Sequence, residues 1–113
     1  MTFSRGDVVK VPFPYTDSAA RQSRPALVVF GPDLEADHGL LWVLMITSAA
    51  NRGWSGDVGI PRLPATGLPV ASVVRTAKIA TIDCAHATRI GRVAPATFTQ
   101  VLRHVGMVAG IAP

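Results

Sequence analysis

Four polar residues stand at the ends or in the middle of segments that are otherwise apolar. Arg24 directly precedes the run PALVVF, and Thr47 and Ser48 close the run LLWVLMITS. Arg75 lies within the stretch ASVVRTAKIATID. If the two apolar runs pair as antiparallel strands, the start of the first meets the end of the second, and Arg24 falls near the hydroxyls. Two guanidinium groups and two hydroxyls that converge in this way would form an anion site suited to a phosphodiester.

Each of these residues also has a simpler interpretation. Thr47 and Ser48 could satisfy backbone groups at the end of a strand, and Arg24 could be a surface cation. Arg75 is the hardest to explain, because a charge inside a half-buried strand is costly unless a partner compensates it. We expect its side chain to emerge at the predicted anion site rather than to enter the core.

The other polar residues indicate no second kind of chemistry. The glycines are scattered at turns and form no phosphate-binding loop. The histidines lie in separate segments without the spacing of a metal site, so we expect neither a metal nor a cofactor. Ser48 and His86 make a poor hydrolase pair, because no nucleophile elbow surrounds the serine. Cys84 is the single cysteine, which excludes an internal disulfide, and we interpret it as a small core residue.

Length and composition set broad limits on the class of protein. The 113 residues fit one domain, 1–113, with one modest core, and 49% hydrophobic against 16% charged residues predict a compact fold. No apolar run reaches the ~18 residues of a membrane helix, and the N-terminal MTFSRGD contains no signal peptide, so we expect a cytoplasmic protein without a membrane partner. The net charge of +4 and the sequence pI of about 10.2 suit phosphate or an acidic protein partner.

The hydrophobic pattern predicts short strands followed by one helix. We expect strands at 7–13, 25–30, 40–48 and 57–61, and one or two more in 71–83 with a kink near Arg75 to Ala77. Pro12 places the first strand at an edge or at a bulge. The connections expected are a long mobile loop at 14–24, a turn or one short helical turn at 31–39, and loops at 49–56 and 62–69. Apolar residues at helical spacing predict an amphipathic helix in 95–113. Together these elements indicate a small barrel capped by the helix, whose broad exposed surface favours a dimer.

The order of four short segments resembles the MazF/PemK family of toxin endoribonucleases, from bacterial toxin–antitoxin pairs. The segments are GDVVKVPFPYTD, RPALVV, ITS and SVVRTAKIATID, and the likeness runs from Gly6 to the final helix. The resemblance implies a mainly β fold with a C-terminal α-helix, a small SH3-like β-barrel of the MazF/CcdB type, and a homodimer. It also implies metal-independent, sequence-specific cleavage of single-stranded RNA, chiefly mRNA, to 2′,3′-cyclic phosphate and 5′-hydroxyl ends. The expected protein partner is an acidic antitoxin.

The resemblance also assigns roles to individual residues. The motif arginine before the Pro-Ala-Leu strand falls on Arg24, the strand-end hydroxyls fall on Thr47 and Ser48, and the arginine that some members carry after Val-Val falls on Arg75. In those members an aspartate with a proton-transfer role follows two residues later, and here that position is Ala77. A histidine that some members carry in the first loop is also absent.

Further residues are candidates for RNA binding. Arg21, Arg52 and Trp54 lie on two predicted loops, where they would hold flanking phosphates and stack a base, and Lys78 is a further cation near Arg75. Trp54 is explained equally well as a rim residue at a dimer contact. Two other functions stay open: a non-catalytic toxin of a related barrel that poisons DNA gyrase, and an inactive member that retains only antitoxin binding. A gyrase poison would not need Arg24 beside Thr47.

Overall fold

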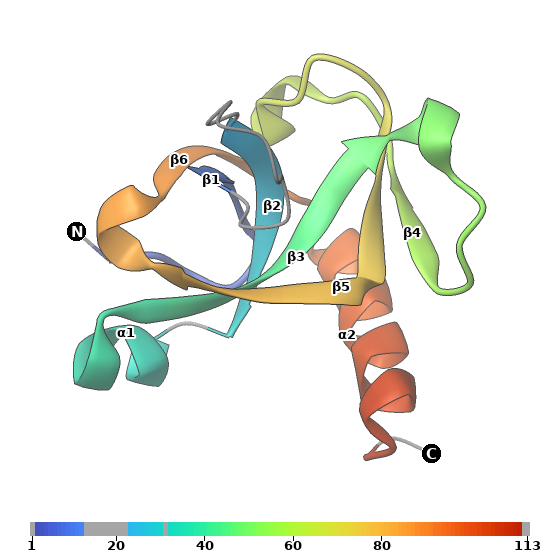
Figure 1. The fold of residues 1–113 in the computed structure, drawn as a ribbon. Coiled ribbons are helices and arrows are strands. Elements are labelled where there is room, and N and C mark those ends of the chain that lie inside the picture. Colours follow the sequence, from blue (N-terminus) through green and yellow to red (C-terminus); the bar gives the residue numbers. More distant parts are fainter. Residues whose placement is uncertain (1, 13–22, 31, 112–113) are drawn as a thin grey trace.

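The computed structural model describes residues 2–12, 23–30 and 32–111, and it consists of one curled antiparallel sheet with two α-helices (Figure 1). The strands are β1 (Asp7–Pro12), β2 (Ser23–Phe30), β3 (Leu40–Ser48), β4 (Asp57–Ile60), β5 (Ser72–Asp83) and β6 (Thr88–Arg92). The helices are α1 (Pro32–His38) and α2 (Pro95–Ala109), with short 3-10 turns at η1 (Ala49–Asn51), η2 (Pro64–Thr66) and η3 (Cys84–His86). The predicted fold class, mainly β with a C-terminal helix, is confirmed.

The strand order is β4-β5-β3-β2-β1-β6, and every pairing is antiparallel. The sheet curls strongly, but within the described part of the chain no backbone pairing joins β4 to β6. The barrel is therefore left open between its two outer strands.

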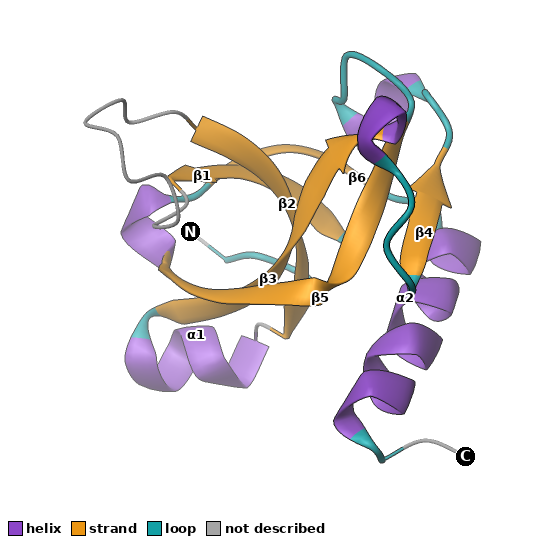
Figure 2. Ribbon diagram, turned by 45° about the vertical axis from the view of Figure 1, so that its right-hand side comes forward, coloured by secondary structure: helices purple, strands orange, loops and turns teal. Residues whose placement is uncertain are grey.

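Alternating side chains divide the core into two layers, because successive residues of a strand point to opposite faces. One layer lies between the sheet and α2 and is built from residues such as Leu27, Leu44, Val74 and Val101. Figure 2 shows α2 beside β4 and β5. The second layer fills the other, concave face, and its members include Val9, Val11, Ala26, Val28, Val43 and Ala80.

Several predicted boundaries agree with the structure, and others do not. The strand predicted at 40–48 is β3, and the kink predicted near Arg75 is a register shift, because Met45 pairs with Arg75 while the preceding Leu44 pairs with Ile79. The segment 31–39 contains a helix of seven residues, and the C-terminal helix ends at Ala109, before Gly110 in a left-handed conformation. The predicted loop at 14–24 falls mainly on residues 13–22, outside the described residues, but its last residue, Arg24, already belongs to β2.

The placement of β1 corrects the prediction of an edge strand. β1 lies inside the sheet, between β2 and β6, although its pairing with β6 ends at Lys10 and so leaves Pro12 without a partner on that side. The pairing with β6 does contain a register shift, but it lies between Val8 and Val9 and not at Pro12, where the bulge was predicted. β6 was not predicted, because its segment TRIGR is short and largely polar. Arg92 of β6 forms an ion pair with the buried Asp7 of β1, which holds this strand in place.

No helix among the described residues combines the length and the apolar character that crossing a membrane would require.

Candidate functional site

The predicted antiparallel pairing of β2 with β3 is present, and it brings Arg24 to the level of Thr47. Ala26 pairs with Met45 and Leu27 with Leu44, and this pairing ends two residues before Arg24 on β2 and two residues before Thr47 on β3, so the two residues lie at the same end of the strand pair. Met45 in turn pairs with Arg75. Because every second residue of a strand shares a face, Arg24, Thr47 and Arg75 lie on one face of the sheet. The same face of the sheet carries the second core layer.

Arg24 carries an unusual polar atom. Its Nε is buried and has no hydrogen-bond partner among the described residues, although the residue as a whole is half-buried. A buried donor without a partner costs free energy, and a charged one costs more, so such groups are rare in folded proteins. The Arg24 Nε is therefore a donor that an acceptor reaching into this face would satisfy.

Thr47 has its hydroxyl oriented by a neighbour that the sequence did not reveal as functional. The amide Nδ2 of Asn51, in η1, donates a hydrogen bond to the Thr47 Oγ1 at 3.0 Å. The hydroxyl accepts this bond and keeps its own hydrogen available to a further acceptor. Thr47 therefore presents a donor on the same face as Arg24.

Ser48 is placed differently from Thr47, with which it was grouped. It follows Thr47 in β3 and pairs with Ser72, so its side chain leaves the strand on the other face. Its Oγ accepts the backbone N–H of Ala50 at 3.2 Å and caps η1. The structure thus does not bring the Ser48 hydroxyl together with Arg24, and the residue supports the turn that carries Asn51.

Arg75 does not emerge freely at this face, and our expectation for it was wrong. The residue is only 7% exposed, and its Nε and Nη2 donate to the two carboxylate oxygens of Asp57 at 3.2 and 3.0 Å. Its Nη2 also donates to the backbone carbonyl of Asn51 at 2.7 Å. The reason is the register of β4 on β5, which sets Asp57 directly opposite Arg75. A partner from the neighbouring strand therefore compensates the buried charge.

Asp57 is held by more than its arginine. Its Oδ2 accepts the backbone N–H groups of Gly53 and Trp54 at 3.3 and 3.2 Å. Burial raises the pKa of the Asp57 carboxyl, but the hydrogen bonds and charge of Arg75, together with these two N–H groups, outweigh it and hold the pKa below its usual range. The carboxylate is thus ionised at neutral pH.

Two of the predicted RNA-binding residues, Trp54 of the β3–β4 connection and Lys78 of β5, lie beside this ion pair. The Trp54 ring lies under the guanidinium of Arg75, with 4.3 Å from Cζ to the ring centroid, and the Lys78 Nζ lies 5.2 Å from the same centroid. Trp54 is nevertheless 47% exposed. Arg52 is exposed and donates to the carbonyl of Ala49. Arg21 lies outside the described residues.

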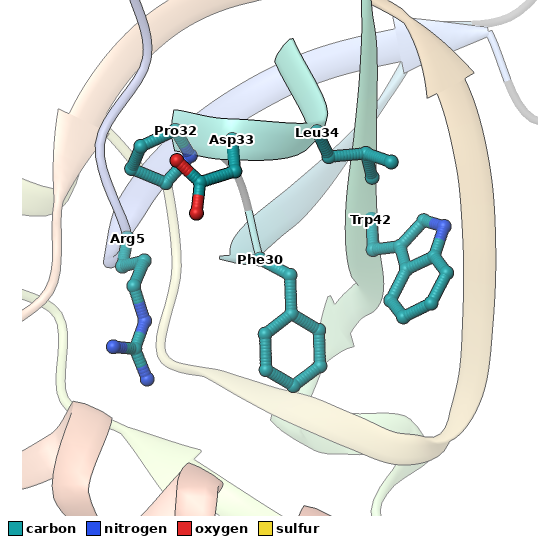
Figure 3. Close-up of a pocket in the computed structure, with 6 residues that line it drawn as sticks. All are labelled: Arg5, Phe30, Pro32, Asp33, Leu34 and Trp42. Atoms are coloured by element: carbon teal, nitrogen blue, oxygen red, sulfur yellow. The ribbon is translucent and has the colours of Figure 1, made fainter. Parts of the chain in front are cut away.

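A separate pocket lies at the far end of the same strands. It has a volume of about 460 Å³ and is lined by Arg5, Phe30, Pro32, Asp33, Leu34 and Trp42. Figure 3 shows Phe30 and Trp42 extending from the sheet into this space, and their rings meet edge to face at 5.6 Å. Phe30 ends β2 and Trp42 lies near the start of β3, so a whole strand length separates this pocket from Arg24 and Thr47.

In the part of the chain that the structure describes, no three or more histidine, cysteine or carboxylate side chains come together as ligands for a metal ion.

Comparison with known proteins assigns the chain to a family. A family model described as "PemK-like, MazF-like toxin of type II toxin-antitoxin system" matches residues 4–108. The chain therefore belongs to the PemK/MazF family of toxins from toxin–antitoxin systems. A search of curated proteins found no sequence match.

Solved structures share the whole fold. MazF from Deinococcus radiodurans superposes with a TM-score of 0.79 at 21% identity, and the match covers 97% of this chain and 98% of that one. A MazE-MazF complex from the same organism gives 0.78 at 20% identity, with 99% of each chain covered. An endoribonuclease in complex with its cognate antitoxin, from a mycobacterial species, gives 0.76 at 18% identity, with 96% of each chain covered. At these identities the likeness establishes the fold.

Two residues of the site escaped the sequence reasoning. Asp57 was read as the start of a short strand, and Asn51 as part of a loop. One signal for Asp57 was available in the sequence. It is an isolated acid at the start of a predicted short strand, and Arg75, a buried cation in another predicted strand, required an acidic partner. Asn51 had no signal, because its role depends on the turn that η1 makes after β3.

Proposed function

We propose that this protein is a toxin that cleaves single-stranded RNA, chiefly mRNA, at short sequences and without a metal ion. The observation that carries the proposal is the buried, unpartnered Nε of Arg24 on the same face as the Thr47 hydroxyl. Family membership supports an endoribonuclease, and a guanidinium and a hydroxyl on one face of the sheet suit a phosphodiester anion.

RNA brings its own nucleophile, the 2′-hydroxyl, so the protein only has to orient it in line with the phosphorus and stabilise charge on the phosphate oxygens. Attack forms a bond from the 2′-oxygen to phosphorus and breaks the bond to the 5′-oxygen. The products are a 2′,3′-cyclic phosphate and a 5′-hydroxyl, with the 2′-proton lost and a proton gained by the leaving oxygen.

Arg24 and Thr47 have the main roles in this scheme. Arg24 binds the phosphate and stabilises its developing charge, and Thr47 donates a hydrogen bond to the same oxygens. Arginine is a poor proton donor, because its pKa exceeds about 12, so electrostatic stabilisation is its contribution. Asn51 orients the Thr47 hydroxyl, and Ser48 caps the turn that carries Asn51.

Arg75 contributes in another way than direct contact with phosphate. Its Nε and Nη2 are engaged by Asp57 and by the Asn51 carbonyl, so those donors are not available to the RNA. Arg75 instead holds the backbone carbonyl of Asn51, whose side chain donates a hydrogen bond to Thr47. Arg52, Lys78 and, beyond the described residues, Arg21 supply positive charge for the flanking phosphates.

The protein partners follow from the family and from charge. Related toxins form complexes with antitoxins, and the net charge of +4 here suits an acidic antitoxin segment that orders on binding. We propose that it occupies the RNA-binding face of a homodimer in the cytoplasm.

The test is cleavage of a long RNA by the purified protein in EDTA, with the ends of the fragments mapped. Fragments with 5′-hydroxyl and cyclic phosphate ends are expected. Activity that vanishes in EDTA and returns with magnesium would overturn the mechanism. Inhibition of DNA gyrase without any RNA cleavage would favour the gyrase poison instead.

A further inference from the structure

The β3–β4 connection, which carries Trp54, is tied to the sheet at three points. Arg75 donates to the carbonyl of Asn51 at the start of the connection, and Asp57 accepts two backbone N–H groups in its middle, including that of Trp54. Thr76 donates to the carbonyl of Gly56 at its end, at 2.8 Å. All three side chains come from two adjacent strands, β4 and β5.

Backbone conformation fixes the connection further. Gly53 and Gly56 have φ angles of +136° and +86°, which residues with a side chain rarely adopt. A Cβ on Gly56 would also stand 2.6 Å from the Thr76 Oγ1. The connection therefore has one preferred shape, which its own sequence and the strands behind it determine together.

Trp54 projects from this fixed segment with nearly half of its surface exposed. The guanidinium of Arg75 lies against its ring, and the Lys78 ammonium lies near it, so the aromatic surface is set among cations. Exposed aromatic rings among positive charges stack nucleobases while the cations hold the backbone. Because Trp54 loses little freedom on binding, such a stack is favoured by preorganisation.

We propose that Asp57 is a positioning residue which, with Arg75, fixes Trp54 as a stacking platform for a base of single-stranded RNA. The substrate class rests on the proposed function. Asp57 is not a substitute for the proton-transfer aspartate that this chain lacks at Ala77, because its oxygens already accept bonds from Arg75, Gly53 and Trp54. It acts on RNA through Trp54.

The experiment measures RNA binding separately from cleavage. The probe is an RNA whose nucleotides are all 2′-O-methylated, which removes the attacking hydroxyl. A Trp42→Phe background leaves Trp54 as the single tryptophan, and Trp42 lies at the opposite end of the sheet. Trp54 fluorescence then reports the stacked base directly, while cleavage of unmodified RNA at saturation reports the chemical step.

Trp54→Ala should weaken binding of the probe by roughly 5- to 150-fold, the range for one stacked base, and Trp54→Phe by less. Asp57→Asn, which keeps the shape and removes the charge, should weaken binding and increase acrylamide quenching of Trp54. The double variant Asp57→Asn/Trp54→Ala should bind no more weakly than Trp54→Ala alone, because both changes remove the same contact. Asp57→Asn should lose more in affinity for the probe than in the rate of cleavage at saturating RNA, because its effect on RNA acts through Trp54.

Thr76→Val provides a second variant if Asp57→Asn does not fold, since it releases only the Gly56 end of the connection and should also raise Trp54 quenching and weaken binding. Additive losses of affinity in the double variant, or an unchanged affinity in Trp54→Ala, would overturn the inference. Cleavage of unmodified RNA by the wild-type protein would still support the proposed function in that case. Conversion of a dimer to a monomer by Trp54→Ala, seen by analytical ultracentrifugation, would overturn it too. Probe binding with Trp54 quenching but no cleavage of unmodified RNA would uphold the platform and refute the proposed activity.

Discussion

Arg75 and Asp57 face one another across β5 and β4, joined by two hydrogen bonds, with side chains that are only 9% and 8% exposed. This pair turns an apparent anomaly, a charge inside an apolar strand, into a link between the sheet and the β3–β4 connection. The contribution of the pair to the free energy of unfolding, and the dependence of that contribution on pH, are both measurable.

Removing one partner of this pair should destabilise the fold strongly. Arg75→Met leaves the Asp57 carboxylate buried and uncompensated, which typically costs about 3–5 kcal/mol, whereas the double variant Arg75→Met/Asp57→Leu should recover much of that loss. Urea unfolding of the single and double variants measures both values. Arg89→Met is the matched control, because this arginine is 54% exposed in its ion pair with Asp7 and its loss should cost about 1 kcal/mol or less. A loss in the double variant equal to the sum of the losses of Arg75→Met and Asp57→Leu alone would show that the pair is not coupled.

The lowered pKa of Asp57 gives the pair a signature in acid. Its stabilisation is fully present above the pKa of an unfolded aspartate, about 3.9, and is lost as the pH falls through the lower folded value. The wild-type free energy of unfolding should therefore fall below about pH 4 by more than that of Asp57→Asn, whose amide does not titrate. Urea unfolding at a series of acidic pH values measures the difference. Asp37→Asn, an exposed change in α1, serves as control, and a steep acid loss that survives in Asp57→Asn would refute this assignment.

Arg24 and Thr47 should dominate the chemical step. Arg24→Ala and Thr47→Ala each remove one preorganised donor to a charged transition state, and each should reduce single-turnover cleavage at saturating RNA by about 10²–10³-fold. Thr47→Ser keeps the hydroxyl and should lose far less. Asn51→Ala, which only releases the Thr47 hydroxyl, should fall between them. A near wild-type rate for Arg24→Ala, with cleavage abolished in Arg75→Ala, would invert the roles proposed here.

Arg75→Ala should act through binding more than through chemistry. The variant frees the β3–β4 connection and removes a cation beside Trp54, so affinity for RNA should fall and the salt dependence of binding should become shallower. Binding of 2′-O-methylated RNA measured against salt concentration tests this, with thermal unfolding as a check that the variant is folded at the assay temperature. An unchanged salt slope would count against any electrostatic contribution of Arg75.

The antitoxin should compete with RNA. We expect an acidic segment to cover the same basic face, so that saturating antitoxin blocks cleavage and displaces 2′-O-methylated RNA. A competition titration followed by fluorescence anisotropy of the labelled RNA measures the displacement. Full cleavage in the presence of saturating antitoxin would place the two binding sites on separate surfaces.

The sequence by itself determined strands β1 to β5, the C-terminal helix and their order, but not β6. Alternation and apolar runs located β1 to β5, and helical spacing located α2, because these patterns depend on local periodicity. Antiparallel pairing of 25–30 with 40–48 was enough to bring Arg24 toward Thr47, since both residues lie at facing strand ends. The order of the short motifs identified the family.

The tertiary structure decided which side chains become partners, because local sequence patterns do not contain this information. The environment of Arg75 depends on the register of β4 against β5, which sets Asp57 opposite it, and a shift of one residue would have turned that carboxylate to the other face. Likewise, the separation of Ser48 from Thr47 and the support of Thr47 by Asn51 follow from the turn after β3. Such partners are distant in sequence or depend on a single backbone turn, so only the folded chain could show that Arg75 is a buried anchor rather than a free cation.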